Sequence, residues 1–454
     1  MPAQVPSAAG DGASTALRTD RYELTMLDAA LRSGVAGRRA VFEVFARGLP
    51  HGRRYGVLAG TGRLAGLIEA FRFGPGELAY LEAAGGLSDA ALEVLAGYRF
   101  TGEVLAYGEG EVYFPDSPVL TVEAPFGEAV LLETLVLSAL NFDSAVAAAA
   151  SRMVTAAGSR PIIEMGSRRI HEEAAVAAAR AAYIGGFQAS SNLEAGRRYG
   201  VPTAGTVAHA FVLAHGCERD AFVAQLETLG LGTTVLVDTY DVAAGIEAAV
   251  GAARSLGARG PGAIRLDSGD LARTACQARA QLDRLGARAT RIVASSDLDE
   301  LRLATLASAP VDVYGVGTRL VTGSGAPTAG FVYKLVAIAD EPGADAPLRP
   351  VAKQSVDKGS VGGKKGAFRL EDAAGAALGE VVVPFGDPPA APPPGGTARA
   401  LQVPLPTGGG SGGELEAARA RHARVRASLG ERGLDLEPGR PLLQVDRSAL
   451  AGRR

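Results

Sequence analysis

The chain has 454 residues, 47% of them hydrophobic, and a formal net charge of −3 at neutral pH. This length predicts two or three domains, and the hydrophobic content excludes a disordered or fibrous protein. Because there is no large basic block, we expect no nucleic acid and no anionic membrane as a main partner.

Targeting segments and paired cysteines are not evident in the sequence. Residues 1–13 lack the basic and apolar segments of a signal peptide. The longest apolar runs, such as Ala145–Ala150, fall far short of the roughly 20 residues of a membrane span. Cys217 and Cys276 have neither disulfide nor metal-site spacing, and we expect both to be small core residues. These features predict a cytoplasmic protein.

The N-terminal part is expected to hold a disordered tail, residues 1–16, and an α+β domain, residues 17–128. Thr19 or Asp20 can cap a first helix, and Val41–Phe45 alternates apolar and polar residues as a half-buried strand does. Further β-like runs separated by Gly and Pro indicate an antiparallel sheet. These runs are Gly102–Tyr107, Glu111–Phe114 and Val119–Val122.

Residues 129–336 have the pattern of an α/β barrel domain. An Ala-rich helix is predicted over Val130–Ala156, interrupted near Asn141–Asp143, and short apolar strands then alternate with amphipathic helices. The strands are predicted at Pro161–Glu164, Val201–Gly205, Thr233–Asp238, Ala263–Asp267, Arg291–Ser295 and Val311–Gly315. The helices are predicted at Glu172–Ala182, Glu218–Leu229, Val242–Leu256, Leu271–Leu285 and Asp299–Ala307. Polar residues recur at the strand ends, which favours a partial barrel over an open Rossmann-like sheet.

The C-terminal part is expected to return to the first domain over residues 337–385, with strands at Pro350–Gln354, Phe368–Leu370 and Glu380–Val383. The Pro/Gly-rich stretch 386–413 is expected to be a flexible insert, and residues 414–454 a helix and a tail. The predicted fold class is therefore α/β: an irregular, partial parallel α/β barrel plus an N-terminal α+β sandwich domain that C-terminal strands complete.

The candidate catalytic residues follow these strands. His209 lies just past the strand expected at Val201–Gly205, and Asp238 and Asp267 each end a strand. In parallel α/β proteins, ligands bind at the carboxyl ends of the strands. Paired carboxylates there suit Mg²⁺ or ribose hydroxyls. Considered alone, the histidine is better explained as a core or turn residue that satisfies a hydrogen bond.

Several further strand ends carry groups that bind anions. Arg168 and Arg319 offer guanidinium groups, and Ser296, Gly315 and Gly317 offer small turns whose backbone N–H groups can hold a phosphate. The loop Lys358–Lys365 is rich in Gly and Lys but lacks the Walker spacing. Ordinary tight turns and a solvated hairpin tip are the alternatives. Together with the histidine and the two carboxylates, these groups suit a polyphosphorylated sugar substrate.

A series of motifs follows in order along the chain. It comprises Thr19-Asp20-x-Tyr22, Glu164-x-Gly166-x-Arg168-Arg169, Gly185-Gly186-Phe187-x-x-Ser190-Ser191-Asn192, Gly205-Thr206-x-Ala208-His209, Asp238-Thr239-Tyr240-Asp241, Arg265-x-Asp267-Ser268-Gly269-Asp270, Ser295-Ser296-Asp297 and Gly315-x-Gly317-Thr318. Over about residues 15–385 this series resembles nicotinate phosphoribosyltransferases.

The resemblance implies a type II phosphoribosyltransferase fold and a homodimer with shared active sites. It implies transfer of phosphoribosyl from 5-phosphoribosyl 1-pyrophosphate to nicotinate, giving nicotinate mononucleotide and pyrophosphate for NAD biosynthesis. It also implies ATP as a co-substrate that transiently phosphorylates His209, and Mg²⁺ as the cofactor.

The resemblance further implies individual roles. Tyr22 of the partner subunit stacks on the pyridine, and Arg168, Ser190, Thr206 and Arg319 contact nicotinate or phosphate oxygens. Asp238 and Asp267 serve ribose hydroxyls and Mg²⁺, with Arg265 beside them, and Ser360 touches the sugar pyrophosphate. Met165 departs from the pattern, since many relatives carry phenylalanine there.

Three alternatives stay open. A nicotinamide-using relative should carry a carboxylate near the substrate amide, whereas Ser190–Asn192 has none, which favours the acid. Quinolinate would call for more cationic groups and a decarboxylation. A catalytically inactive ligand-binding relative would not be expected to retain His209 and both aspartates.

Overall fold

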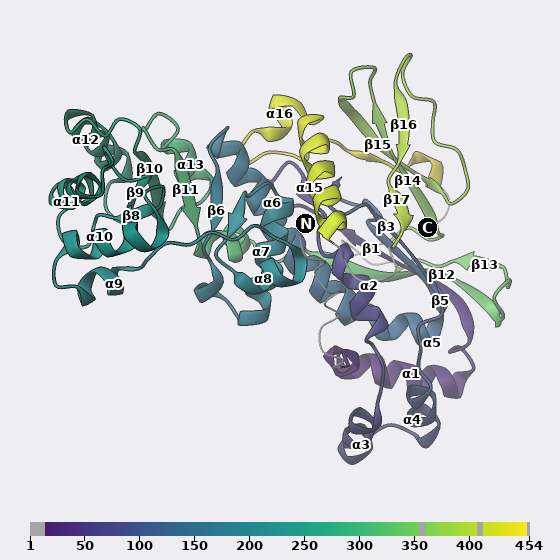
Figure 1. Ribbon diagram of the computed structural model, residues 1–454. Coiled ribbons are helices and arrows are strands. Elements are labelled where there is room, and N and C mark those ends of the chain that lie inside the picture. Colours follow the sequence, from purple (N-terminus) through teal and green to yellow (C-terminus); the bar gives the residue numbers. More distant parts are fainter. Residues whose placement is uncertain (1–13, 354–359, 406–411, 452–454) are drawn as a thin grey trace. The chain divides into compact units, whose positions relative to one another are not determined.

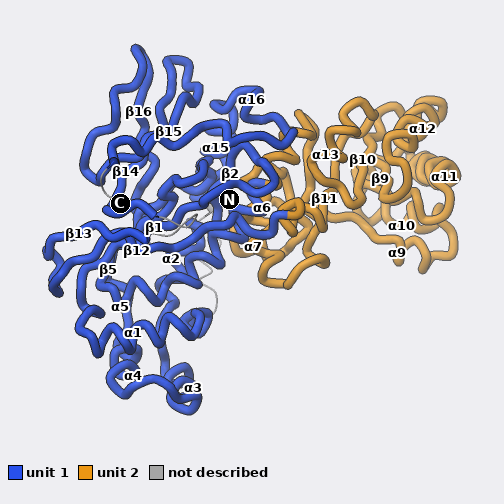
Figure 2. The backbone as a smooth tube through the Cα atoms, turned by 180° about the vertical axis from the view of Figure 1, so that it is seen from behind, with its two compact units in different colours: residues 1–148, 326–454 blue, residues 149–325 orange. Residues whose placement is uncertain are grey.

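The structure is a computed structural model that describes residues 14–353, 360–405 and 412–451 and shows two compact units (Figures 1 and 2). Unit 1 comprises residues 1–148 and 326–454, and unit 2 comprises residues 149–325. Each unit has its own sheets and its own buried core.

The main sheet of unit 1 joins both ends of the chain. Its six antiparallel strands have the order β13-β12-β1-β5-β3-β17. They are β1 (Arg38–Ala46), β3 (Glu103–Tyr107), β5 (Leu120–Pro125), β12 (Phe331–Pro342), β13 (Leu348–Pro350) and β17 (Gln402–Pro404). The C-terminal strands β12, β13 and β17 therefore complete the N-terminal sheet, which confirms this part of the predicted fold class.

Strand β1 is buried on both faces, so the half-buried strand predicted at Val41–Phe45 is wrong. Phe42 stacks on Tyr333 with ring centroids 4.8 Å apart. The polar residue of the alternation, Glu43, is also buried, and one carboxylate oxygen lies 2.6 Å from Nζ of Lys365. A charged residue at a polar position of the pattern can thus be internal when a partner from a distant segment neutralises it.

Unit 1 also contains several helices (Figure 1). They are α1 (Arg21–Ser33), α2 (Thr61–Glu69), α3 (Pro75–Ala84), α4 (Asp89–Ala96), α5 (Phe126–Ala129), α15 (Gly412–Ala427) and α16 (Gly430–Leu434). Helix α6 (Glu133–Ala157) runs on into unit 2 without the interruption expected near Asn141–Asp143. Asn141 accepts the Phe331 N–H at 2.8 Å, and Asp143 accepts two N–H groups of Arg63, so these polar side chains are used without breaking the helix.

One helical stretch meets the length and hydropathy criteria for a membrane span, although the uninterrupted apolar runs in the sequence were judged too short for one. It covers Phe126–Ala157, with a mean hydropathy of 1.5 in its most apolar window. Within the described residues, 67% of that window is buried inside the protein, as in the core helix of a globular domain.

The Pro/Gly-rich stretch 386–413 contains strands, which corrects its expected role as a flexible insert. Strand β16 (Thr397–Ala400) joins a four-stranded sheet of order β16-β14-β15-β18, and β17 joins the main sheet. The other members are β14 (Lys365–Glu371), β15 (Ala377–Pro384) and β18 (Val445–Asp446), and β2 (Gly56–Val57) pairs separately with β4 (Val112–Tyr113). The prolines and glycines mark the turns beside these strands; residues 406–411 lie outside the described part.

Parts of both expected tails are packed into the fold. At the N-terminal side, the Thr15 N–H donates to the Ala70 carbonyl at 3.0 Å and Ala16 is fully buried, while residues 1–13 lie outside the described part. Near the C-terminus, β18 pairs with β15 and Leu450 is buried. The strand expected at Pro350–Gln354 lies earlier, as β13, and Gln354 is outside the described residues.

Unit 2 contains a curled parallel sheet of six strands in the order β7-β6-β11-β10-β9-β8. They are β6 (Ile162–Glu164), β7 (Ala189–Ser190), β8 (Thr234–Leu236), β9 (Ala263–Leu266), β10 (Arg291–Ser296) and β11 (Val313–Val316). The last strand, β11, pairs back onto β6, as in a barrel, while no pairing joins β7 to β8 among the described residues. The expected partial parallel barrel is confirmed.

The open seam explains the main error in the predicted strands. The strand expected at Val201–Gly205 is reduced to one bridge between Thr203 and Ser190. Pro202 has no N–H for a ladder. Its carbonyl accepts the Ser190 N–H, and the Ala204 N–H donates to the Ser190 carbonyl, each at 2.9 Å. His209 therefore follows an irregular segment and begins a short helix.

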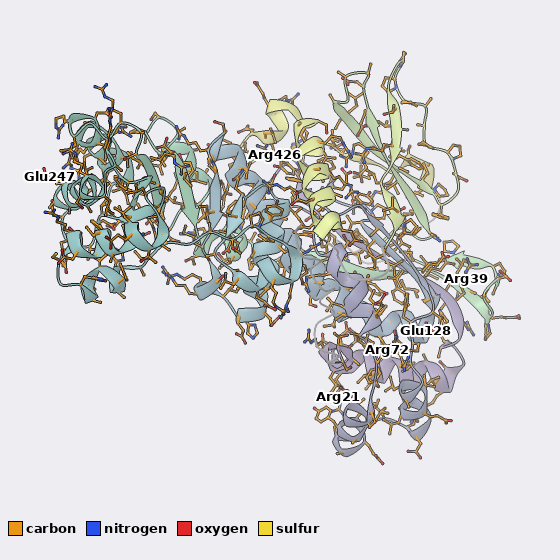
Figure 3. All side chains as sticks on the ribbon, viewed as in Figure 1. Arg21, Arg39, Arg72, Glu128, Glu247 and Arg426 are labelled. Atoms are coloured by element: carbon orange, nitrogen blue, oxygen red, sulfur yellow. The ribbon has the colours of Figure 1, made fainter. Side chains whose placement is uncertain are left out.

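Helices follow the strands of unit 2, with the predicted ones within a few residues of their expected bounds. They are α7 (Glu172–Ile184), α8 (Leu193–Tyr199), α9 (His209–Ala214), α10 (Glu218–Leu229), α11 (Val242–Ser255), α12 (Leu271–Arg284), α13 (Glu300–Thr305) and α14 (Thr318–Val321). Charged side chains such as Glu247 of α11 lie on their outer faces (Figure 3). Cys217 and Cys276 are also exposed, so their expected core positions are wrong. Cys217 precedes α10, and Cys276 lies on the outer side of α12.

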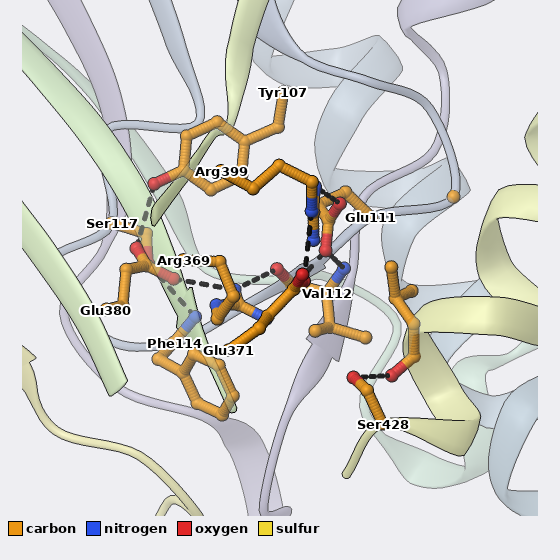
Figure 4. A network of polar contacts seen from close by, with 12 residues as sticks. Tyr107, Glu111, Val112, Phe114, Ser117, Arg369, Glu371, Glu380, Arg399 and Ser428 are labelled. Carbon is orange, nitrogen blue, oxygen red and sulfur yellow. Dashed lines mark hydrogen bonds and ion pairs between the residues drawn. The ribbon is translucent and has the colours of Figure 1, made fainter. Parts of the chain in front are cut away.

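A buried ionic network links the six-stranded and the four-stranded sheets of unit 1 (Figure 4). Arg369 of β14 is fully buried, and its Nη2 lies 2.7 Å from a carboxylate oxygen of Glu380 on β15. Tyr107 of β3 donates its hydroxyl to Glu380 at 2.8 Å, and Arg399 of β16 lies 2.8 Å from Glu111. Because these charges are removed from water, each depends on its partners.

We predict that Arg369→Met lowers the free energy of unfolding by about 3–5 kcal/mol, because it leaves Glu380 buried without its cation. Urea denaturation measures this loss. The matched control is Arg349→Ala, which breaks an exposed pair with Asp340 at 2.6 Å and should cost at most about 1 kcal/mol. Equal losses in the two variants would contradict the importance of burial.

Helix α11 packs closely on the end of β8 through Gly245. A Cβ at this position would lie 2.3 Å from the Val237 carbonyl oxygen, which is backbone and cannot rotate away. At Gly251 of the same helix, a Cβ would meet nothing within 4 Å.

We therefore predict opposite effects of the same substitution within one helix. Gly245→Ala should destabilise the protein by about 1–3 kcal/mol through overpacking. Gly251→Ala should stabilise it by roughly 0.5–1 kcal/mol, because alanine is the better helix former. Thermal denaturation of both variants tests this, and a neutral Gly245→Ala would show that α11 can move away from β8.

Candidate active site

The carboxyl ends of neighbouring strands in unit 2 bring the predicted catalytic side chains together. Asp238 follows β8, Asp267 follows β9, and His209 is the first residue of α9. Nε2 of His209 lies 3.2 Å from Oδ1 of Asp238. The sequence-predicted convergence of the histidine with the two aspartates is therefore present in unit 2.

Asp238 is the centre of this group. Its side chain is 4% exposed, whereas that of His209 is 42% exposed. While Oδ1 faces the imidazole, Oδ2 accepts the backbone N–H of Asp267 at 2.8 Å and the hydroxyl of Ser268 at 3.1 Å. Because a carboxylate only accepts, Nε2 of the histidine is the protonated nitrogen of this contact, and Nδ1 carries the lone pair.

Arg265, Asp267 and Ser295 form a second polar group beside the first. Nη2 of Arg265 lies 3.0 Å from Oδ1 of Asp267. The Ser295 hydroxyl lies 2.7 Å from Nε of Arg265 and 2.6 Å from the same aspartate oxygen. The predicted neighbourhood of Arg265 and Asp267 is therefore present, while Ser295 is a residue whose part the sequence did not reveal.

Glu164, at the end of β6, organises the turn that carries Arg168. It is buried, accepts the Gly166 N–H and the Ser190 hydroxyl, and its carbonyl accepts the Ser191 N–H at 2.8 Å. Burial raises the pKa of the Glu164 carboxyl, and the hydrogen bonds from Ser190 and Gly166 oppose this rise. The sequence placed Glu164 in a motif without assigning it a role.

Arg168 lies in the short turn η4 (Ser167–Arg169). The side chain of Arg168 is exposed and has no ion pair with any described residue. Asn192 fastens the turn by donating its side-chain N–H to the Ser167 hydroxyl at 3.0 Å. An exposed, unpaired guanidinium on a fixed turn can bind a carboxylate or a phosphate.

Ser190, which was predicted to contact substrate, is fully buried in the structure. Its hydroxyl donates to Glu164 and accepts the Asn192 N–H at 2.9 Å. Ser190 therefore supports the neighbouring turns from inside. Thr206 lies exposed in the segment before α9, and its hydroxyl donates to the Val207 carbonyl at 3.4 Å.

The predicted phosphate-binding residues divide into two groups. Ser296 ends β10, Gly317 precedes α14, and Arg319 lies 3.5 Å from Asp297, with both side chains about half exposed. Gly315 lies inside β11 and is buried, so its expected turn position is wrong. A Cβ at Gly315 would lie 2.8 Å from the Met165 sulfur and 3.1 Å from the Ser295 Cβ, so close packing requires glycine there.

Tyr22 and Ser360 belong to unit 1. Tyr22 lies on α1 with 44% of its surface exposed, and burial of its hydroxyl, aided by the nearby Glu133 and Glu23 carboxylates, raises its pKa to about 12. The Ser360 hydroxyl accepts the Lys353 N–H at 3.1 Å.

A phosphate-binding loop was predicted at Lys358–Lys365, but the two of its lysines that the structure describes form ion pairs within unit 1. Lys364 pairs with Glu123 and Lys365 with Glu43, each at 2.6 Å, while Lys358 lies outside the described residues. The ammonium groups of Lys364 and Lys365 therefore stabilise the sheet, which corrects their predicted role in holding phosphates.

A divalent cation can be tested against the side chains of the described residues. These residues hold no group of three or more His, Cys, Asp or Glu side chains that could bind a metal ion. Asp238 already accepts hydrogen bonds on both oxygens, whereas both contacts of Asp267 fall on Oδ1. Mg²⁺ commonly binds one or two carboxylates together with substrate phosphates, and the unused Oδ2 makes Asp267 the better suited of the two.

Comparison with known proteins identifies the family. Residues 17–141 match the family model of the nicotinate phosphoribosyltransferase (NAPRTase) N-terminal domain, and residues 146–324 match that of the quinolinate phosphoribosyl transferase C-terminal domain. A nicotinate phosphoribosyltransferase of Mycobacterium tuberculosis is 55% identical over 437 residues, which cover 94% of each chain. The Bacillus subtilis enzyme of the same name is 40% identical over 333 residues, covering 72% of this chain and 68% of the other.

The solved structures agree with the sequence relatives. The crystal structure of human nicotinic acid phosphoribosyltransferase superposes with a TM-score of 0.76 at 27% identity, covering 95% of this chain and 98% of the human chain. The fold and the sequence thus lead to one conclusion. The chain belongs to the nicotinate phosphoribosyltransferase family.

Proposed function

We propose that the protein transfers phosphoribosyl from 5-phosphoribosyl 1-pyrophosphate to nicotinate, forming nicotinate mononucleotide and pyrophosphate, and that ATP drives this reaction by phosphorylating His209. The contact that carries the proposal is the 3.2 Å hydrogen bond between His209 and Asp238. The chain is 55% identical to a nicotinate phosphoribosyltransferase, and this similarity supports nicotinate and the sugar pyrophosphate as the substrates. The pathway served is NAD biosynthesis.

In the phosphorylation step, Nδ1 of His209 is the nucleophile. Asp238 holds the proton on Nε2, so the Nδ1 lone pair can attack the γ-phosphorus of ATP. The new N–P bond replaces the bond to ADP, and water later cleaves it to phosphate. Asp238 orients the ring through this hydrogen bond, as in other carboxylate–histidine pairs.

In the transfer step, positioning and charge stabilisation lower the barrier. The ribose C1 gains positive character as pyrophosphate departs, and the pyridine nitrogen attacks it. The free oxygen of Asp267 and the guanidinium of Arg265 face this chemistry, and Arg168 and Arg319 bind anionic oxygens, with Thr206, Ser296 and Gly317 near the phosphates. Mg²⁺, when bound, would neutralise the leaving pyrophosphate, and Asp267 is the residue suited to hold it.

The proposal extends to assembly and location. Tyr22 is half exposed on α1, so a homodimer can bring Tyr22 of the partner subunit over the pyridine. Ser360 then contributes a contact to the sugar pyrophosphate. We also propose a cytoplasmic location.

A second candidate substrate is quinolinate, because residues 146–324 match the quinolinate phosphoribosyl transferase domain. That substrate carries a second carboxylate and must lose carbon dioxide during the reaction. The similarity of 94% of the chain to a nicotinate enzyme favours nicotinate. Carbon dioxide release from quinolinate would reverse this choice.

We predict that His209→Asn abolishes acid-labile phosphate incorporation from ATP and lowers ATP hydrolysis about a hundredfold or more, while slow transfer to nicotinate persists. The control is His215→Asn, at the other end of α9, where the ring contacts Phe211. The control should hydrolyse ATP at the parent rate. Unchanged hydrolysis in His209→Asn would contradict the phosphohistidine, and complete inertness of the parent protein would indicate a ligand-binding relative.

We predict that nicotinate is preferred over nicotinamide by about tenfold or more in kcat/KM, because the amide forgoes a charge-assisted contact with Arg168. Arg168→Ala should remove most of this preference. Arg197→Ala, which breaks an exposed pair with Glu194 on α8, serves as the control and should preserve it. A preference of the parent protein for nicotinamide would refute the assigned substrate.

A further inference from the structure

We propose that Ser295 is a positioning residue that holds Arg265 and Asp267 in one fixed arrangement at the end of β9. This inference rests on the proposed function, in which those two side chains face the ribose and its phosphates. It differs from the predicted role of the adjacent Ser296 as a phosphate contact. The hydroxyl of Ser295 acts through its neighbours.

The location of Ser295 suits this role. It is 3% exposed on β10, which lies between β9 and β11 in the parallel sheet. The strand register places Ser295 opposite Gly315 of β11. A Cβ added at Gly315 would lie 3.1 Å from the Cβ of Ser295. The glycine therefore leaves the space that Ser295 occupies, and the hydroxyl points to β9.

The hydrogen bonds of Ser295 have only one possible direction. A guanidinium donates and a carboxylate accepts, so Nε of Arg265 donates to the hydroxyl at 2.7 Å, and the hydroxyl donates to Oδ1 of Asp267 at 2.6 Å. Nη2 of Arg265 donates to the same Oδ1 at 3.0 Å and closes the ring. Each member of the triangle thus restricts the other two.

The triangle determines which atoms remain available. Oδ1 of Asp267 receives two donors, and among the described residues nothing donates to Oδ2. The side chains of Arg265 and Asp267 are only 15% and 25% exposed, so their orientation is set inside the protein. Ser295 thereby directs a single carboxylate oxygen and the outer guanidinium N–H groups toward the ligand.

Loss of the Ser295 hydroxyl should impair binding of the sugar pyrophosphate and leave binding of nicotinate intact. Without the hydroxyl, Arg265 and Asp267 keep one contact, but Nε of the arginine loses its acceptor. Recognition of the sugar pyrophosphate should weaken, while the anion-binding turn at Arg168 has no hydrogen bond to Ser295 and should act normally.

The test compares Ser295→Ala with Ser295→Thr, which retains the hydroxyl. Titration calorimetry with 5-phosphoribosyl 1-pyrophosphate should show about tenfold weaker binding for Ser295→Ala, as expected for the loss of hydrogen bonds to charged groups. The KM for this substrate should rise similarly and the KM for nicotinate should stay within about twofold. Ser295→Thr should restore most of the binding.

The matched control is Thr290→Val, just before the start of β10. Thr290 is 3% exposed and donates its hydroxyl to the Pro261 carbonyl at 2.7 Å, so its replacement removes a buried hydrogen bond far from the strand's carboxyl end. This variant should lose stability without a change in either KM.

The inference is overturned if Ser295→Ala binds the sugar pyrophosphate as the parent does, or if both KM values rise equally. The calorimetric measurement separates it from the proposed function. If the parent protein binds the sugar pyrophosphate but does not convert nicotinate, the proposed function is refuted. The role of Ser295 can still be tested in that case by comparing the affinities of the parent and Ser295→Ala for this compound. Failure of the parent to bind this compound would overturn both.

Discussion

The hydrogen bond between Asp238 and His209 is the contact on which the whole site depends. Asp238 receives the imidazole on one oxygen and the turn after β9 on the other, so one buried carboxylate joins a helix start to two strand ends. Burying a carboxylate is costly unless hydrogen-bond donors such as these replace the lost water. The same bonds that satisfy it also orient the ring, so stability and chemistry have a single structural cause here.

The curled parallel sheet creates this contact by bringing distant segments to one edge. Strand β11 pairs back onto β6, and each βα connection adds polar residues at the same end. Close packing supports the arrangement, because Gly245 and Gly315 let a helix and a neighbouring side chain approach the strands. In unit 1, buried ion pairs such as Lys365 with Glu43 join segments that are far apart in sequence.

The sequence predicted the alternation of strands and helices in unit 2 well, because hydrophobic periodicity is a local property. It also predicted the C-terminal completion of the first sheet and the grouping of His209, Asp238 and Asp267. It failed where long-range contacts decide. Pro202 and the open seam reduce one expected strand to a bridge, and Glu43 is buried only because Lys365 reaches it. Ser190 and Ser295 are ordinary serines in sequence, and their inward hydrogen bonds depend on neighbouring strands.

The orientation of the His209 ring yields the most direct test of this account. Since Nε2 faces Asp238, a phosphoryl group from ATP should be attached to Nδ1. Phosphorus NMR of the phosphorylated protein, with the modified residue mapped by mass spectrometry, distinguishes the two ring nitrogens. We expect phosphate on Nδ1 of His209, and phosphate on Nε2 or on any other residue would contradict the proposed role of the Asp238–His209 contact.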